Sequence, residues 1–140
     1  MGAYFNTDQQ DIDAYSYIAD VFKNKIKNVK ITQPIDIENY RQNYILQNPT
    51  ADINNINKAM VDFDLLQVKH ADLLFCDISN KSTGVGIELG VAKENNKKII
   101  FVAKQNSKIS NMIFGAFPDN TVYYYSSLQD LKNYIESLNF

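Results

Sequence analysis

The stretch ADLLFCDISNKSTGVGIELGVAKENNKKIIFV, residues 71–102, decides the fold of this chain. It reads as a buried strand, a loop, a glycine-rich turn, a helix and a second buried strand. Both strands are apolar on their two faces, which is typical of interior strands in a parallel sheet covered by helices. Glu88 lies where the glycine turn becomes the helix. Because open α/β sheets bind ligands beyond the carboxyl ends of their strands, a carboxylate at this place is well positioned for chemistry.

The rest of the chain repeats this alternation of strand and helix. Apolar residues recur at helical spacing in five segments, and short β-branched and aromatic runs lie between them. We therefore predict one α/β domain over residues 1–140, with a doubly wound parallel sheet that is Rossmann-like or flavodoxin-like. The predicted helices cover about residues 10–27, 52–69, 84 onward, 110–114 and 126 onward, the last with a capping box of Ser126 and Gln129, and the predicted strands cover 29–32, 73–76, 99–103 and 121–125.

One segment does not fit this alternation. Residues 34–50 are bracketed by Pro34 and Pro49, rich in asparagine and glutamine, and only weakly periodic. We predict a long loop there, with at most one helical turn, lying over the edge of the sheet. Loops of that length in compact domains tend to be functional or mobile.

Composition excludes several classes of function. The net charge of −2 argues against general affinity for nucleic acid or an anionic membrane, since both reward basic clusters. The single cysteine, Cys76, excludes an internal disulfide and a multi-cysteine metal site, and its apolar neighbours favour a core thiol. No apolar run approaches membrane-spanning length, and residues 1–10 lack the pattern of a signal peptide. We expect a soluble cytoplasmic protein.

The glycine turn does not match the dinucleotide fingerprint. Gly84, Gly86 and Gly90 invite the comparison, but that pattern requires glycine where this chain has Leu89. Glu88 has two readings. The partial positive charge of a helix N-terminus would hold its carboxylate ionised at the lip of a cleft, ready to act as a nucleophile. Alternatively, it is a first-turn acidic residue that only suits the helix dipole.

The pattern STGVGIELG and its flanks resemble the nucleoside 2-deoxyribosyltransferase family. The resemblance implies a Rossmann-like enzyme that cleaves the N-glycosidic bond of a deoxynucleoside through a covalent sugar–enzyme ester. It makes Glu88 the nucleophile, and Asp64, in DFDLLQVKHAD, the residue that contacts the base and helps to protonate it. The substrate would lie against Gly84 and Gly86. The resemblance implies no metal and no redox cofactor.

Two further segments extend the resemblance over nearly the whole chain. SNMIFGAFPDN is similar to the segment that one subunit lends to its neighbour's site, with Asn111 at the polar contact. This implies a homo-oligomer, at least a dimer, with shared active sites. NTDQQ resembles the loop after the first strand, where Thr7, Asp8 and Gln10 match.

The chain departs from the family pattern at its start. The family has a first strand with a tyrosine close to the nucleophile, whereas here that strand is missing or reduced to residues 1–5, with Tyr4 as a possible substitute. This departure keeps open a third reading, a non-catalytic nucleotide-binding domain.

A second departure concerns the substrate. Ser82 stands where transferases acting on nucleosides have an aspartate. Together, Ser82 and Ser110 resemble the serines of the deoxynucleoside 5′-monophosphate N-glycosidases, which contact the phosphate. Ser82 could equally be a helix N-cap. Asp77 could orient sugar hydroxyls or cap a loop. Our first prediction is deoxyribosyl transfer between nucleobases, and the alternative is hydrolysis of deoxynucleoside 5′-monophosphates.

Overall fold

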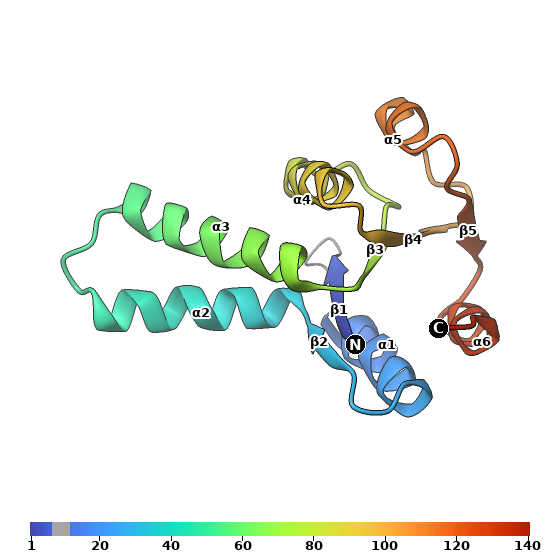
Figure 1. The fold of residues 1–140 in the computed structure, drawn as a ribbon, viewed down its shortest axis with the longest axis horizontal. Coiled ribbons are helices and arrows are strands. Elements are labelled where there is room, and N and C mark those ends of the chain that lie inside the picture. Colours follow the sequence, from blue (N-terminus) through green and yellow to red (C-terminus); the bar gives the residue numbers. More distant parts are fainter. Residues whose placement is uncertain (7–11) are drawn as a thin grey trace.

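A computed structural model describes residues 1–6 and 12–140 (Figure 1). Strands and helices alternate through most of the chain, as the sequence predicts. The strands are β1 (Gly2–Asn6), β2 (Lys30–Thr32), β3 (Leu73–Asp77), β4 (Lys98–Lys104) and β5 (Val122–Tyr125), and the helices are α1 (Ile12–Lys25), α2 (Pro34–Gln47), α3 (Ile53–His70), α4 (Thr83–Glu94), α5 (Asn111–Ala116) and α6 (Leu128–Ser137).

The strands form one parallel sheet in the order β2-β1-β3-β4-β5. This is the flavodoxin-like order, so the predicted doubly wound fold is confirmed. The first strand, which the sequence left as either missing or reduced to residues 1–5, is present as the short strand β1. Tyr4 pairs with Leu74 of β3 and Thr32 of β2. The chain order reverses between β1 and β3, and such switch points are where open α/β sheets bind ligands.

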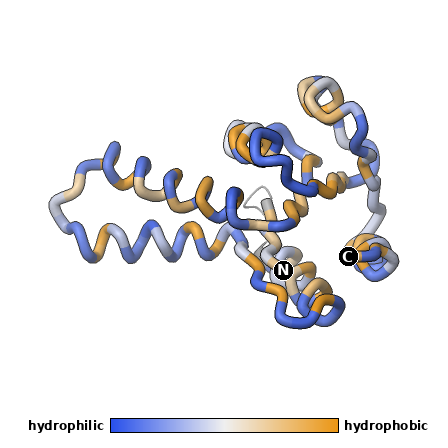
Figure 2. The backbone as a smooth tube through the Cα atoms, viewed as in Figure 1, coloured by the Kyte–Doolittle hydropathy of each residue, from blue (hydrophilic) through white to orange (hydrophobic). Residues whose placement is uncertain are grey.

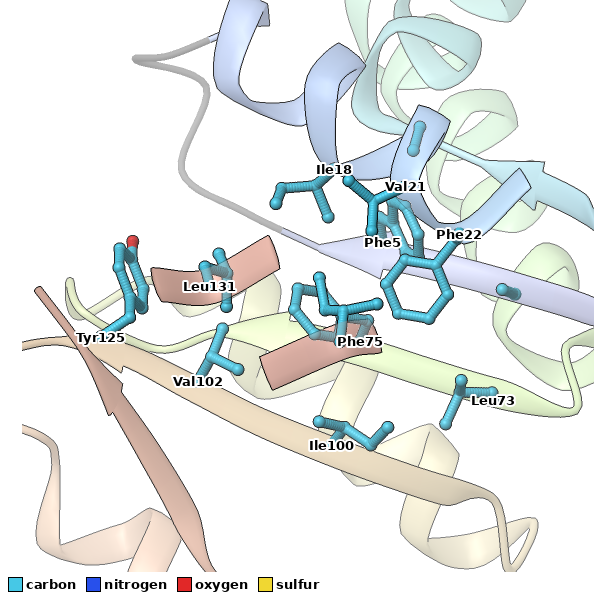
Figure 3. Packing of buried hydrophobic residues seen from close by; sticks show 13 residues of the cluster. Phe5, Ile18, Val21, Phe22, Leu73, Phe75, Ile100, Val102, Tyr125 and Leu131 are labelled. Atoms are coloured by element: carbon cyan, nitrogen blue, oxygen red, sulfur yellow. The ribbon is translucent and has the colours of Figure 1, made fainter. Parts of the chain in front are cut away.

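Helices cover both faces of the sheet (Figure 1). Along β3 the side chains alternate, with Leu73 and Phe75 facing α1 and α6 while Leu74 and Cys76 face α3 and α4. Figure 3 shows the first of these two cores, where the rings of Phe5, Phe22 and Phe75 meet at centroid distances of 4.9 to 5.6 Å. Cys76 is fully buried in the second core, as predicted.

The predicted loop over residues 34–50 is wrong, because α2 occupies most of it. Pro34 begins the helix, where a missing N–H does no harm, and the Asp36 carboxylate accepts the Gln33 N–H at 2.8 Å. The rings of Tyr40 and Phe63 stack at 4.0 Å, which holds α2 against α3 in a hairpin that extends away from the sheet (Figure 1). Polar and apolar residues alternate along α2 without a continuous stripe (Figure 2), so sequence periodicity could not reveal it.

The remaining helices lie close to their predicted positions. One start differs: Ser127, not Ser126, caps α6, because its hydroxyl accepts the Asp130 N–H at 3.1 Å. The capping box predicted that the Gln129 side chain would accept the Ser126 N–H. Asp130, the next residue, accepts it instead, at 2.8 Å. Among the described residues, no helix combines the length and the apolar character that crossing a bilayer requires.

Candidate functional site

The site is built around Glu88, the sixth residue of α4. Ser82 caps this helix, and its hydroxyl accepts the Val85 N–H at 3.4 Å. The helical period then turns Val85, Glu88 and Leu89 toward the sheet, where all three are buried. Glu88 is the single charged residue in the described part of the chain that is buried, with 7% of its surface exposed. A glutamate carboxyl with so little water contact requires a specific environment.

That environment consists of other acidic groups. The Tyr4 hydroxyl, from β1, donates a hydrogen bond to Oδ1 of Asp64, from α3. Both side chains also interact with Glu88. Within residues 1–6 and 12–140 no lysine or arginine forms an ion pair with Glu88, and its Oε2 has no hydrogen-bond partner. Three elements that are distant in sequence thus bring a tyrosine and two carboxyl groups together.

Burial controls the protonation of this pair. Loss of hydration raises the pKa of Glu88, and the charge of Asp64 beside it raises that pKa further. Burial also raises the pKa of Asp64, but the hydrogen bonds from Tyr4 and Glu88 act in the opposite direction. The pKa of Tyr4 is raised by its own burial and by both carboxyl groups. A proton on this pair therefore resides preferentially on Glu88.

The expectation that the helix dipole holds Glu88 ionised is wrong. Glu88 lies in the second turn of α4 and not in the first, and the dipole effect falls off within the first turn. Desolvation dominates, and it acts against the charged form. The alternative reading of Glu88, as a first-turn acidic residue that only suits the helix dipole, is also wrong, because Glu88 is buried in the second turn of α4.

Ser82 and Ser110 both line a hollow next to the start of α4. Both line a depression of about 300 Å³ between the start of α4 and α5, together with Lys81 and Gly86. Each serine is also a helix N-cap, since Ser110 accepts the Met112 N–H at 3.3 Å. The structural reading of Ser82 is therefore observed, and its contact with a phosphate stays a prediction.

Gly84 and Gly86 border open space. A Cβ on Gly86 would meet no atom within 4 Å, and one on Gly84 would meet only the Ser82 hydroxyl, at 3.8 Å, in the part of the chain that the structure describes. Their backbone is thus not covered by other side chains among the described residues. Asn111 is exposed at the start of α5 and lies outside the lining of the hollow.

Asp77 lies at the same sheet edge but on the other face. Its Oδ1 accepts the Ser79 N–H at 2.9 Å, and its Oδ2 accepts the Tyr125 hydroxyl at 2.6 Å. It lines a hollow of about 420 Å³ between α1 and the start of α6. The loop-capping contact is therefore present, whereas the structure does not bring Asp77 together with Glu88 and Asp64.

The sequence left the role of Tyr4 open, and the structure places it at the centre of the cluster. The sequence signal for Tyr4 was the tyrosine that the resembling family has near its nucleophile. The position of Tyr4 beside Asp64 follows from the register of β1 with β3, which the sequence could not give. Thr7, Asp8 and Gln10, the matched loop residues, lie outside the described residues.

Two solved structures are similar to this chain over nearly its whole length. The CMP N-glycosidase BcmB of Clostridium botulinum superposes with a TM-score of 0.70 and 14% identity, covering 97% of this chain and 99% of that one. A 2-deoxyribosyltransferase from Bacillus psychrosaccharolyticus gives a TM-score of 0.69 and 17% identity, covering 100% and 93%. The chain has the fold of the nucleoside 2-deoxyribosyltransferases and related N-glycosidases. No family model and no curated protein matches the sequence itself.

Proposed function

We propose that this protein cleaves the N-glycosidic bond of 2′-deoxynucleosides and transfers the deoxyribosyl group to another nucleobase. The observation that carries the proposal is the carboxyl group of Glu88, which is buried, in contact with Asp64, and free of a hydrogen bond at Oε2 among the described residues. A buried polar atom without a partner is rare and calls for a reason. An oxygen kept available to bond a sugar carbon is such a reason.

The chemistry follows that of retaining glycosidases. Glu88 gives its proton to Asp64 and attacks C1′ as the base departs, through an oxocarbenium-like transition state, and forms a deoxyribosyl ester. Asp64 lies beside it, positioned by the Tyr4 hydroxyl, to contact the base and protonate it. The second base then attacks C1′ from the vacated side. These steps use the side chains of this chain and no cofactor.

A specific observation favours a second candidate, hydrolysis of deoxynucleoside 5′-monophosphates. Ser82 and Ser110 come from different elements and line one hollow next to Gly86, where Lys81 adds a positive charge. A phosphate monoester suits two hydroxyl donors and an ammonium group. The Clostridium neighbour, with the same fold, is named as an N-glycosidase of a nucleoside monophosphate, CMP.

We also propose a homo-oligomer in which a second copy completes each site. Asn111 supports this proposal because it is exposed and adjacent to the hollow that Ser110 lines, so a partner chain could reach it. The neighbouring residues Met112 and Phe114 are exposed and apolar, as subunit contacts often are.

One assay distinguishes these functions. The protein is incubated with deoxyadenosine and free cytosine, and separately with deoxynucleoside 5′-monophosphates, and the products are separated by chromatography. Deoxycytidine in the first incubation supports transfer. Free base and deoxyribose 5-phosphate in the second support hydrolysis instead. Ligand binding without any product would contradict both and favour a non-catalytic nucleotide-binding domain.

A further inference from the structure

The hollow between α1 and the start of α6 has no part in the proposed reaction. It lies at the carboxyl edge of the sheet, where β3, β4 and β5 end, on the face opposite Glu88, and its volume is about 420 Å³. Ligand pockets usually hold about 300–1,000 Å³ and combine a mostly apolar lining with a few polar groups. This cavity, the α1–α6 hollow, therefore has the size of a small-molecule site.

The floor of the α1–α6 hollow is apolar and partly aromatic. Four of its side chains come from α1, β3, β5 and α6 and belong to one core: Ile18, Phe75, Tyr125 and Leu131 (Figure 3). All four are buried, so packing fixes their positions. Tyr15 adds another ring to the lining. A fixed floor with aromatic rings suits the flat face of a ring-shaped ligand.

The rim of the hollow carries two amide side chains, Gln105 and Asn106, in the turn after β4. This turn is held by two backbone bonds, from the Gln105 N–H to the Tyr125 carbonyl at 2.9 Å and from the Ser107 N–H to the Lys104 carbonyl at 3.2 Å. Both amides are exposed, and neither forms a side-chain hydrogen bond within residues 1–6 and 12–140. An amide offers a donor and an acceptor side by side, which matches the edge of a nitrogen heterocycle.

The charges around the hollow disfavour an ionic ligand. Its described lining contains one cation, Lys104, and one carboxylate, Asp77, so it carries no net charge. Asp77 already accepts the Tyr125 hydroxyl at 2.6 Å. The N-terminus of α6, where an anion could otherwise bind, is occupied by the Asp130 carboxylate, which accepts the Ser126 N–H at 2.8 Å. An uncharged ligand therefore fits the hollow best.

We propose that the α1–α6 hollow is a second ligand site, separate from the Glu88 site, that binds an uncharged planar heterocycle such as a free nucleobase. One face of the ring lies on the floor beside Phe75, and its edge forms hydrogen bonds with the amides of Gln105 and Asn106. The inference uses no residue of the proposed reaction. It therefore stands or fails independently of the proposed function.

A titration of nitrogen-15-labelled protein with adenine, followed by NMR, tests the site. Adenine should shift the backbone amide signals of Gln105, Asn106 and Ser126, whereas Gly84 and Gly86 report separately on the proposed catalytic site. Shifts at the two glycines alone, or no shift up to the solubility of adenine, would overturn the proposal.

Benzoate provides the comparison of charge, because it is also a planar ring but is an anion. It should leave the signals of Gln105, Asn106 and Ser126 unshifted at concentrations where adenine shifts them. Tighter binding of benzoate than of adenine at these residues would overturn the assignment of an uncharged ligand.

Two substitutions with matched controls test the rim. Gln105→Ala removes one amide, and Asn106→Gly removes the other while glycine tolerates the φ of 65° found there. Each should raise the Kd of adenine, measured from the Ser126 signal, by about 2- to 13-fold, the range for one lost hydrogen bond. Gln47→Ala, at an exposed amide, and Asn96→Gly, at a φ of 52°, should leave that Kd unchanged. The same Kd in all four variants would overturn the role of the rim amides.

Discussion

Glu88 and Asp77 are two carboxyl groups near the same edge of one sheet, and they differ in burial and in hydrogen bonding. Asp77 is half-buried and both of its oxygens accept hydrogen bonds, one from Ser79 and the other from Tyr125. Glu88 is more deeply buried, and its Oε2 has no partner in the described part of the chain. A carboxylate whose oxygens are all bonded stabilises a loop, whereas one left unsatisfied in the interior is available for chemistry. From this contrast we predict a structural role for Asp77 and a chemical role for Glu88.

Turnover gives the largest expected effect. Glu88→Gln preserves shape and removes the nucleophile, so activity should fall by about 10,000-fold or more, as for other catalytic nucleophiles. Asp77→Asn, the matched change on the other face, should retain activity within about tenfold. Steady-state rates on the preferred substrate measure both. Equal losses in the two variants would remove the distinction between the sites.

The stability of the fold should respond to the loss of the Asp77 hydrogen bonds. Asp77→Ala leaves the Tyr125 hydroxyl and the Ser79 N–H without their acceptor, so unfolding free energy should fall by about 1–3 kcal/mol. Tyr125→Phe removes one bond and leaves Asp77 partly satisfied, which should lower it by about 1 kcal/mol. Urea unfolding monitored by circular dichroism gives both values. A neutral result for Asp77→Ala would mean that its hydrogen bonds contribute nothing net.

The pH dependence of stability sharpens the comparison further. The pKa of Glu88 is raised in the folded state, so the folded protein keeps a proton that the unfolded chain releases above the ordinary glutamate value of about 4.3. The contribution of Glu88 to stability is therefore fully present below that pH and is lost as pH rises toward the raised value. Glu88→Gln should flatten this decline in urea titrations at a series of pH values. An unchanged slope would contradict the buried, protonated state of Glu88.

Much of the fold could be predicted because its main elements carry strong local signals. The apolar runs of β3 and β4 and the periodic face of α3 are long enough to be recognised from composition and spacing alone. Helix α2 was missed because its stability comes from Pro34 and Asp36 at its start and from the stacking of Tyr40 on Phe63, not from an amphipathic stripe. The stacking partner lies on another helix, which no local pattern contains.

The sequence named the residues of the candidate site but could not give their protonation. The glycine turn and its flanks pointed to Glu88 and Asp64, whose roles stay predictions, and the structure places the two in contact. Their protonation could not be read from sequence, because it depends on burial beneath α4 and on the approach of Tyr4 from β1. Both are consequences of tertiary packing. A helix-dipole argument applied to sequence alone therefore gave the wrong charge for Glu88.

Covalent trapping tests the central claim most directly. The protein is incubated with a 2-fluoro-2-deoxyribosyl nucleoside, whose slow turnover accumulates the ester, and is then digested and analysed by mass spectrometry. We predict a fluorinated sugar adduct on Glu88, in the peptide that contains GVGIELG, and no adduct in Glu88→Gln. An adduct on another side chain, or none under conditions where the natural substrate is cleaved, would contradict the account.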